Sequence, residues 1–431
     1  MHYQDLAITD VLVIGGGPAG STIAALLAEQ GKSVILIDKD QHPRFHIGES
    51  LLPFNVPLLD RLGVLAQVRQ IGMPKFGIEF VSPDHERPSF LEFSSGWHKD
   101  MSYSFQVRRA EFDHILLKNA VAKGANVIEG TRVTAVDFPN VGGVIATVTG
   151  SAGEVAQHRA RFVVDASGRD SFLAGQLKVK RRNLRHASAA VFGHFTDAER
   201  LPSRQAGHIS IFWFAHGWFW FIPLLDGTTS VGAVCAPAIV KNRQGDVTEL
   251  FRTLIESCPA LSARLKKAAL IGEATGTGNY SYSTTQSSSA RYLMIGDAAG
   301  FIDPVFSTGV YLAMRGAVNA AAVVSTCLED PAQAQQVLRR FEQISKKEVE
   351  RFSWFIYRMT SPAIRNLFMA PRNYFRIEEA ILALLSGDVG AESPIRFRLL
   401  LFKMLYYAKT ALSFVSRQRA RSRQPAVTQS Q

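Results

Sequence analysis

Cysteine is scarce in this chain of 431 residues, and no two cysteines form a paired motif. Cys235, Cys258 and Cys327 are an odd number of residues at long spacings. This usage predicts buried thiols in a reducing compartment and argues against catalysis through a redox-active disulfide. The N-terminal stretch MHYQDLAITD also lacks the apolar segment of a secretory signal. The sequence therefore predicts a cytoplasmic protein.

Acidic residues are absent from residues 396–423, although that stretch holds eight Arg or Lys and the whole chain carries a formal charge of +11. Residues 395–415 have the pattern of a long, largely apolar helix in which Arg396, Lys403, Thr410 and Arg417 recur every seven residues. This helix could pack on the core, lie peripherally on an anionic membrane, or receive an acidic carrier protein. Nucleic acid is not among the expected partners.

The run His208–Leu225 lacks Asp, Glu, Lys and Arg and is close to the length of a membrane span. Gly217 and Pro223 interrupt it, and it is rich in aromatic residues. We therefore interpret it as two strands of a sheet with a turn at His216-Gly217.

A dinucleotide-binding motif lies near the N-terminus. An apolar strand at residues 10–14 leads into GGGPAG at residues 15–20, a helical pattern follows, and a second strand ends at Asp38. The glycines allow a tight turn and a close approach of the pyrophosphate, and the helix N-terminus attracts the phosphates. Asp38 has the spacing of an acid that accepts a ribose hydroxyl. Because the motif occurs once, the sequence predicts one bound dinucleotide.

Four further segments resemble those of FAD monooxygenases similar to p-hydroxybenzoate hydroxylase. They are HPRFHIGESLL at residues 42–52, FQVRRAEFD at 105–113, FVVDASGRDS at 162–171 and the strand that leads into Gly296-Asp297. The resemblance implies that the dinucleotide is FAD, with Asp165 partly structural. The FAD contacts that it implies are Gly15, Gly17, Pro18, Ala19, Gly20, Asp38, Lys39, Arg44, Gly48, Glu49, Ser50, Gln106, Arg109, Asp165, Gly296, Asp297, Pro304 and Gly309.

Three more motifs resemble those of flavin-dependent halogenases. They are WFWFIP at residues 218–223, FIDPVFSTG at 301–309 and GMPKFGIEF at 72–80. The resemblance implies an enzyme that uses FADH2, O2 and chloride or bromide to make hypohalous acid, which then halogenates an electron-rich aromatic ring. It also implies a separate NAD(P)H-flavin reductase as the source of FADH2.

The same resemblance implies roles for single residues of these motifs. Lys75 would hold the hypohalous acid and direct it to the ring, and burial would lower the pKa of its amine. The backbone N–H groups of Thr308 and Gly309 would bind the halide just before a helical pattern. Ser307 belongs to this catalytic turn, and Trp218 and Trp220 would keep the substrate away from the flavin.

One departure from the halogenase pattern concerns the substrate. Indole-directed members resembling this sequence carry Glu immediately before the Ser of the FxxPxxSxG motif, and this chain has Phe306 there. The difference favours the phenol- or pyrrole-directed branch. The aromatic substrate would be either a free small molecule or one tethered to an acyl or peptidyl carrier protein.

Other functions are compatible with parts of the pattern. Aromatic hydroxylases and reductases similar to the geranylgeranyl reductases share the FAD segments, and a halogenase-like scaffold without turnover could serve as a binding partner. The intact FxxPxxSxG motif together with Lys75 favours the halogenase. His42, His46 and Glu49 resemble a metal-binding set, but Pro43 interrupts any helix that would align them, so we expect no metal.

These patterns predict an α/β protein in which a Rossmann-like FAD-binding domain is interleaved with an antiparallel-sheet substrate domain, followed by a helical C-terminal region. The FAD-binding lobe would comprise residues 1–75, 105–183 and 284–330. Strands of the substrate lobe would occupy residues 76–104 and 184–283, and residues 331–431 would form the helical region with its basic tail.

Overall fold

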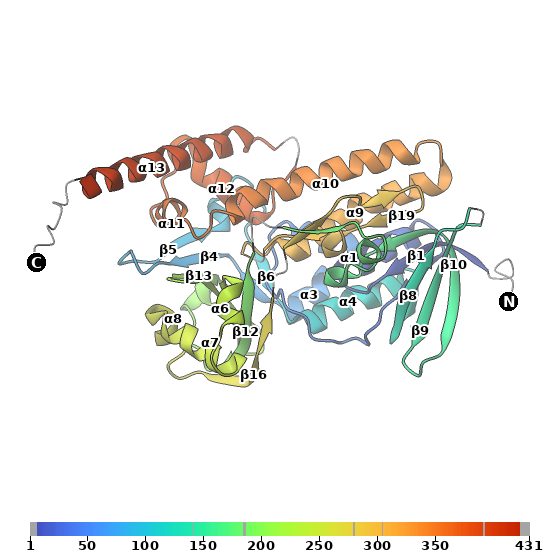
Figure 1. Ribbon diagram of the computed structural model, residues 1–431, viewed down its shortest axis with the longest axis horizontal. Helices are drawn as coiled ribbons and strands as arrows, with labels where there is room; N and C mark the ends of the chain where they lie inside the picture. Colours follow the sequence, from blue (N-terminus) through green and yellow to red (C-terminus); the bar gives the residue numbers. More distant parts are fainter. Residues whose placement is uncertain are drawn as a thin grey trace, which may run out of the picture.

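The computed structural model describes residues 7–140, 142–183, 187–278, 281–303, 305–390 and 393–422, with side chains up to residue 412 (Figure 1). Its central sheet has the strand order β18-β19-β10-β1-β2-β7. β1 (Ile8–Ile14) pairs in parallel with β10 (Val155–Asp165) and with β2 (Val34–Ile37). Helix α1 (Pro18–Glu29) follows β1 and packs against α4 (Arg109–Ala122) on one face of this sheet. The expected Rossmann-like unit is present.

A second sheet of seven strands has the order β16-β12-β15-β14-β13-β4-β5. Its bounds are β4 (Gly77–Val81), β5 (Ser89–Glu92), β12 (Ala189–Thr196), β13 (Ile209–Phe214), β14 (Gly217–Pro223), β15 (Thr229–Cys235) and β16 (Ala269–Thr277). The charge-free run therefore forms two antiparallel strands, as expected. The sheet is not purely antiparallel, because β4 comes from a distant part of the chain and pairs with β13 in parallel.

Three helices interrupt the region that the sequence predicted as strands. They are α6 (Pro237–Lys241), α7 (Val247–Glu256) and α8 (Pro259–Arg264). The carboxylate of Asp246 caps α7 by accepting the N–H of Glu249 at 2.8 Å, and Phe251 is buried against the back of the sheet. No helix was predicted within this lobe, because the aromatic alternation of neighbouring segments obscured this short amphipathic pattern.

The C-terminal region is helical and covers both lobes (Figure 1). Its helices are α9 (Thr308–Glu329), α10 (Ala334–Ile356), α11 (Pro362–Met369), α12 (Ile377–Ser386) and α13 (Arg396–Ser422). Among the described residues, α9 is the one helix long and apolar enough to cross a membrane. It packs against α1 and α10, so its apolar residues form part of the hydrophobic core.

The remaining elements are short or lie at sheet edges. Cys235, Cys258 and Cys327 are buried and free, which confirms the prediction of buried thiols. The bounds of these elements are α2 (Asn55–Leu62), α3 (Leu65–Ile71), α5 (Phe172–Gln176), β3 (Met73–Lys75), β6 (Ser104–Gln106), β7 (Asn126–Ile128), β8 (Thr131–Asp137), β9 (Val144–Gly150), β11 (Lys180–Arg182), β17 (Tyr282–Thr284), β18 (Ser288–Ser289), β19 (Tyr292–Met294) and β20 (Gly300–Phe301).

Candidate active site

One cavity of about 1030 Å³ joins the two lobes. It begins at the carboxyl ends of β1 and β2, where open α/β sheets bind their ligands, and it continues to β14 of the second sheet. Such a volume lies at the upper end of the range for ligand pockets, so a ligand as large as a dinucleotide can be enclosed.

The glycine-rich turn at residues 15–20 shapes the first part of the cavity. Gly15 has a φ of +99°, and a Cβ there would lie 2.5 Å from the carbonyl oxygen of Ala166. A Cβ on Gly20 would lie 1.8 Å from the carbonyl oxygen of Gly15, so the absence of a side chain at Gly20 allows α1 to pack closely on the turn. Gly20 itself does not line the cavity. Gly17, Pro18 and Ala19 line the cavity at the N-terminus of α1, where bound phosphates are favoured.

Asp38 lies at the end of β2 and lines the cavity. Its carboxylate accepts hydrogen bonds from the N–H groups of Gly16 and Asp40, which fix its orientation. Lys39 lines the cavity beside it and forms an ion pair with Asp170. This placement suits the predicted contact of Asp38 with a ribose hydroxyl.

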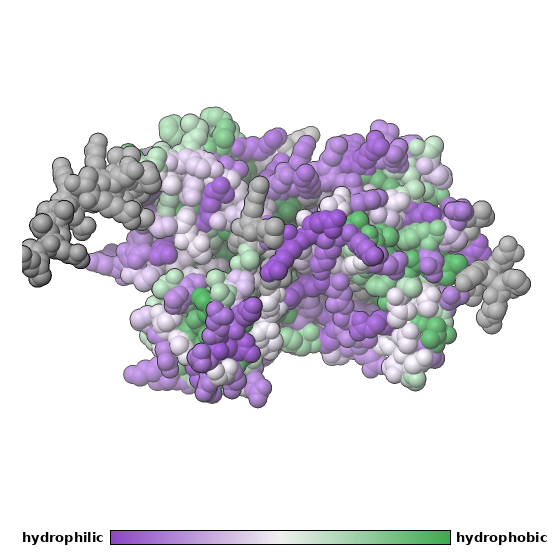
Figure 2. Space-filling model, in the orientation of Figure 1, coloured by the Kyte–Doolittle hydropathy of each residue, from purple (hydrophilic) through white to green (hydrophobic). Residues whose placement is uncertain are grey.

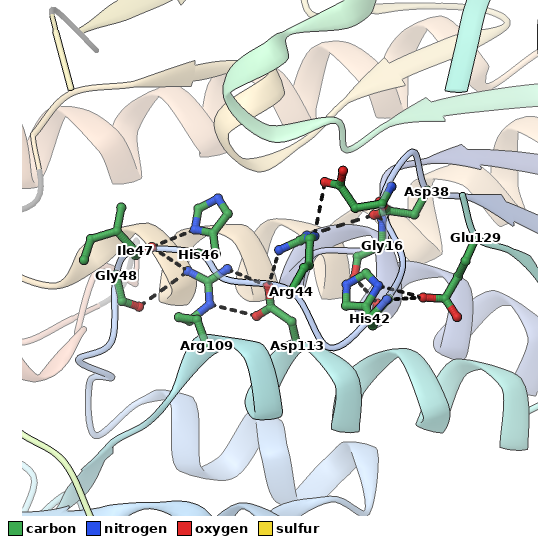
Figure 3. Close-up of polar contacts among 12 residues, drawn as sticks. Gly16, Asp38, His42, Arg44, His46, Ile47, Gly48, Arg109, Asp113 and Glu129 are labelled. Carbon is green, nitrogen blue, oxygen red and sulfur yellow. Dashed lines mark hydrogen bonds and ion pairs between the residues drawn. The ribbon is translucent and has the colours of Figure 1, made fainter. Parts of the chain in front are cut away.

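A buried ion network holds the loop that contains Gly48, Glu49 and Ser50 (Figure 3). Arg109 donates to both carboxylate oxygens of Asp113 at 2.7 and 2.9 Å, and its remaining nitrogen donates to the carbonyl of Ile47 at 3.1 Å. Arg44 approaches the same carboxylate at 3.3 Å. Burial acts to raise the pKa of Asp113, but the guanidinium of Arg109 outweighs it and holds that pKa below its usual value. The loop is therefore fixed by a charged pair that water does not reach.

Replacing Arg109 by methionine should destabilise the fold by about 3–5 kcal/mol, because the carboxylate of Asp113 would stay buried without its main partner. Urea denaturation measures this loss. The double variant Arg109→Met/Asp113→Leu should recover much of it, since no buried carboxylate then remains at this position. Equal stability of the single variant and the double variant would refute this explanation.

Lys75 lies at the end of β3, beneath the loop that the Arg109 network holds, with 1% of its surface exposed. Its Nζ donates to Ser50 Oγ at 3.0 Å and to the carbonyl of Leu51 at 3.1 Å, and it lies 5.4 Å from the ring centre of Phe93. Burial lowers the pKa of Lys75 to about 7. Lys75 itself does not line the cavity, whereas Ser50 does. The side chain of Ser50 thus separates the amine from the cavity.

The far end of the cavity contains the aromatic strand and the turn before α9. Trp218 and Trp220 line it, with ring centres 6.2 Å apart, and Trp220 Nε1 donates to Ser230 Oγ at 3.2 Å. Ser307 and Gly309 also line the cavity, and Ser307 has a φ of +56°, which is uncommon for a residue other than glycine. Strain of this kind is concentrated at ligand sites.

Several predicted contacts lie close to the cavity without lining it. Thr308 is buried at the first position of α9, and Gly296 turns with a φ of +59° behind the cavity wall. Asp165 is structural, since its carboxylate accepts the N–H groups of Ser167 and Leu173 at 2.9 and 2.7 Å. Burial raises the pKa of Asp165. Pro304 lies outside the described residues.

The contact of Gln106 with FAD stays a prediction. Gln106 is fully buried on β6 and donates to the carbonyl of Gly207 at 3.1 Å, away from the cavity. Asp297 lines the cavity as expected, and burial raises its pKa to about 6 against the opposing charges of Arg109 and Arg169.

Some residues that line the cavity were not predicted from the sequence. Thr131–Thr134 belong to β8, Arg169 follows β10, and Phe192 lies on β12. A local glycine turn could have indicated Arg169, which lies in the segment FVVDASGRDS. The β8 residues carry no motif that could have indicated their place at the cavity.

His42, His46 and Glu49 bind three different partners. His42 Nδ1 lies 3.0 Å from Glu129, His46 Nδ1 lies 2.7 Å from the carbonyl of Ile47, and Glu49 accepts from His194 Nε2 at 2.9 Å. Within the described part of the chain, no group of three His, Cys, Asp or Glu side chains is arranged to hold a metal ion. These residues serve the loop structure.

Comparisons with known proteins agree with this geometry. A family model described as tryptophan halogenase matches residues 10–99 and 84–362. A tryptophan 2-halogenase from Chondromyces crocatus is 35% identical over 344 residues, which cover 78% of this chain and 65% of that protein. A 1H-pyrrole-2-carbonyl-(peptidyl-carrier protein) chlorinase from Pseudomonas fluorescens is 29% identical over 403 residues, which cover 88% of this chain and 89% of that protein.

The fold is similar to that of the myxobacterial chondrochloren halogenase CndH, described as a variant of FAD-dependent halogenases. The TM-score is 0.78 at 31% identity, and the match covers 90% of this chain and 92% of that chain. The residues of the cavity suit FAD. A Cβ on Gly17 would meet only Arg44 Nη2 at 3.7 Å, so the backbone before α1 is open to a phosphate group. Asp38 lines the cavity at the strand end where a ribose hydroxyl would bind.

Proposed function

Because this chain belongs to the tryptophan halogenase family and is a flavin-dependent enzyme, we propose that it halogenates an electron-rich aromatic ring with FADH2, O2 and chloride or bromide. The observation that carries the proposal is that a single cavity joins the dinucleotide turn, the tryptophan pair of β14 and the turn before α9. The three motifs are far apart in the sequence, yet they surround the same space.

FAD would be held by the glycine-rich turn, Asp38, Arg44 and Asp297, which all border the cavity. When bound and reduced, FAD supplies the electrons that activate O2 for the oxidation of halide. The protein would supply the halide site. The first N–H groups of a helix have no partner within the helix, so those of Thr308 and Gly309 can bind an anion at the start of α9.

Lys75 and the tryptophan pair would control the oxidant in this proposal. A buried amine whose pKa is about 7 can donate or accept a hydrogen bond without a large change in free energy near neutral pH. The amine already bonds to Ser50, which lines the cavity, so the pair can hold hypohalous acid on the wall of the cavity. Trp218 and Trp220 are bulky and buried on β14, which supports their proposed role in keeping the substrate from the flavin.

The substrate class is proposed as a phenol or pyrrole. Phe306, where the indole-directed pattern has Glu, is buried and has its ring centre 6.5 Å from that of Phe368. No carboxylate is therefore supplied from this position to stabilise an indole cation, and the ring must be activated by its own oxygen or nitrogen. The similarity to a chlorinase named for a carrier-bound pyrrole supports a carrier-tethered substrate as one form.

The decisive experiment combines the protein with FAD, a separate NAD(P)H-flavin reductase and either chloride or bromide. A panel of free phenols and of pyrrolyl- or hydroxybenzoyl-carrier proteins is then analysed by mass spectrometry for halogen isotope patterns. We expect halogenated product that depends on the reductase and on halide. Hydroxylated product without halogen at any halide concentration would instead support the aromatic hydroxylase. Binding of the carrier without any product would support the inactive scaffold, and reduction of an isoprenoid double bond would support the reductase.

We also propose that the protein works in the cytoplasm and contacts a membrane peripherally through its basic C-terminal helix. The support is the composition of residues 396–423, which hold eight Arg or Lys and no acid. The carrier protein remains an alternative partner for the same cations, because carrier docking also depends on opposite charge.

A further inference from the structure

Helix α13 has two apolar faces on opposite sides. Its inner face is made of Leu399, Phe402 and Tyr406, which are buried, as is Ile395 just before the helix. The rings of Phe402 and Tyr406 pack against Trp354. Its outer face contains Phe397, Leu400 and Met404, which are 64%, 54% and 60% exposed. At about 3.6 residues per turn, these three residues share one side of the helix. The inner face attaches α13 to the core of the protein. It does not account for the apolar residues on the outer face.

The outer face is larger than these three residues. Leu405, Tyr407 and Leu412 are also exposed. By helical periodicity Tyr407 lies toward one edge of the outer face, and Leu405 and Leu412 lie toward the other. Figure 2 shows hydrophobic surface gathered over the first half of α13, at the upper left of the molecule. A contiguous apolar surface of this kind on a soluble protein marks a site of interaction with a protein or a membrane.

Basic residues border the outer face on both of its edges. By helical periodicity, Arg396 and Lys403 lie along one edge, and Arg398 and Lys409 lie along the other, between the inner and the outer face. Lys403 lies over the ring of Trp354 at 5.2 Å, so its stem follows the protein surface. Long basic side chains placed at such an edge can extend their charges toward lipid phosphates while their stems stay in apolar surroundings.

A second exposed element adjoins the start of α13. Residues Tyr374–Arg376 form a single turn in which Phe375 has a φ of +54° and is 80% exposed. Arg376 and Arg398 lie over the ring of Trp97 at 3.8 and 4.4 Å, so Trp97 joins this turn to α13. Arg376 forms an ion pair with Glu379 at 2.6 Å.

We propose that the outer face of α13 and the turn Tyr374–Arg376 form one surface that lies on an anionic phospholipid membrane. This inference rests on the proposed membrane contact and is independent of the proposed chemistry. The apolar side chains would enter the boundary between head groups and acyl chains, as in amphipathic helices that lie in the membrane plane. Four cations of α13, Arg396, Arg398, Lys403 and Lys409, would contact the phosphates on both sides of the helix.

The distribution of charge favours lipid over a protein partner. A membrane surrounds the helix on both edges at once, and α13 has cations on both edges with no acid between residues 396 and 412. A second copy of this chain would bring the same cations to the interface, and like charges would oppose the contact. A carrier protein would need acidic groups on both sides of an apolar strip.

Co-sedimentation of the full chain with vesicles tests the proposal. One vesicle set contains phosphatidylcholine alone, and the other contains equal parts of phosphatidylcholine and phosphatidylglycerol. We expect binding to the anionic vesicles that weakens with added salt. The triple variant Phe397→Ser/Leu400→Ser/Met404→Ser should lose this binding. The double variant Arg396→Gln/Lys409→Gln should weaken it by about fivefold for each cation removed.

The matched control is Val121→Ser/Val155→Ser/Ile271→Ser, which removes three exposed apolar side chains from other surfaces. It should bind the vesicles like the unaltered chain. FAD binding, thermal stability and halogenation of a soluble substrate should be unchanged in both triple variants, so a failure of the proposed chemistry would be visible separately. Equal binding of both vesicle sets, or none, would overturn the proposal. Unchanged vesicle binding by the α13 triple variant would also overturn it. The proposal would fail as well if this variant bound vesicles normally but no longer bound a carrier protein or another copy of the chain.

Discussion

Replacing Lys75 by methionine should reduce halogenation by about 10²–10⁴-fold while the protein still binds FAD. Methionine has nearly the length of lysine and lacks the N–H groups that reach Ser50 Oγ and the carbonyl of Leu51. The cavity itself should keep its shape, because Lys75 does not line it. Product is measured by mass spectrometry, FAD binding by fluorescence, and uncoupled turnover by the release of hydrogen peroxide, which should persist.

The control for this experiment is Lys123→Met, because Lys123 is a half-buried residue whose ion pair with Glu29 is partly exposed to solvent. This variant should halogenate like the unaltered chain. Undiminished product from the Lys75→Met variant would remove Lys75 from the mechanism. Loss of FAD binding together with loss of product would instead assign Lys75 to the support of the loop at Gly48–Ser50.

Lys75 should also make stability depend on pH. Its pKa is lowered by burial from 10.5 to about 7, so in the folded state the charged form is disfavoured. Between about pH 7 and pH 10 the unfolded chain binds this proton and the folded chain does not, so stability rises with pH in that window. The Lys75→Met variant should therefore gain at most about 5 kcal/mol near pH 6.5, and about 1 kcal/mol near pH 9.5. Urea denaturation at the two pH values measures the difference, and an equal effect at both would contradict it.

The sequence predicted those parts of the site that local backbone geometry determines. Gly15 and Asp38 could be assigned because a tight turn and a strand end each require particular residues at fixed spacing. The resemblance to the FxxPxxSxG motif pointed to Ser307 and Gly309, which lie in a turn that starts a helix and is therefore a local structure. All four line the cavity.

The sequence could not predict features that depend on contacts between distant segments. The side chain of Gln106 points toward Gly207 because β6 pairs with β3, and no local pattern reports that pairing. For α13, the spacing of Arg396, Lys403 and Thr410 indicated one basic stripe. Only the packing of Leu399 and Phe402 on the core shows that a second apolar face is left exposed between two basic edges.

Replacing Gly309 by proline should raise the KM for halide by about 10- to 100-fold, because it removes one N–H donor from an anion site. A hydrogen bond to a charged group contributes about 1.5–3 kcal/mol, and the N–H at this position of α9 is not used within the helix. Proline is tolerated in the first turn of a helix for that reason. Initial rates at varied chloride and bromide measure the effect.

The matched control is Gly309→Ala, which keeps the N–H group. A Cβ at this position would lie 3.5 Å from Phe301 Cε2, which is an ordinary van der Waals contact, so alanine fits without movement of the turn. The alanine variant should keep the halide KM of the unaltered chain, and both variants should retain FAD binding because the glycine-rich turn and Asp38 are untouched. If the proline variant kept the same halide KM, the anion would have to bind elsewhere, and the strained turn at Ser307 would then need another function. If its halide KM rose and peroxide release rose with it, the halide would be shown to compete with water for the oxidant at this turn.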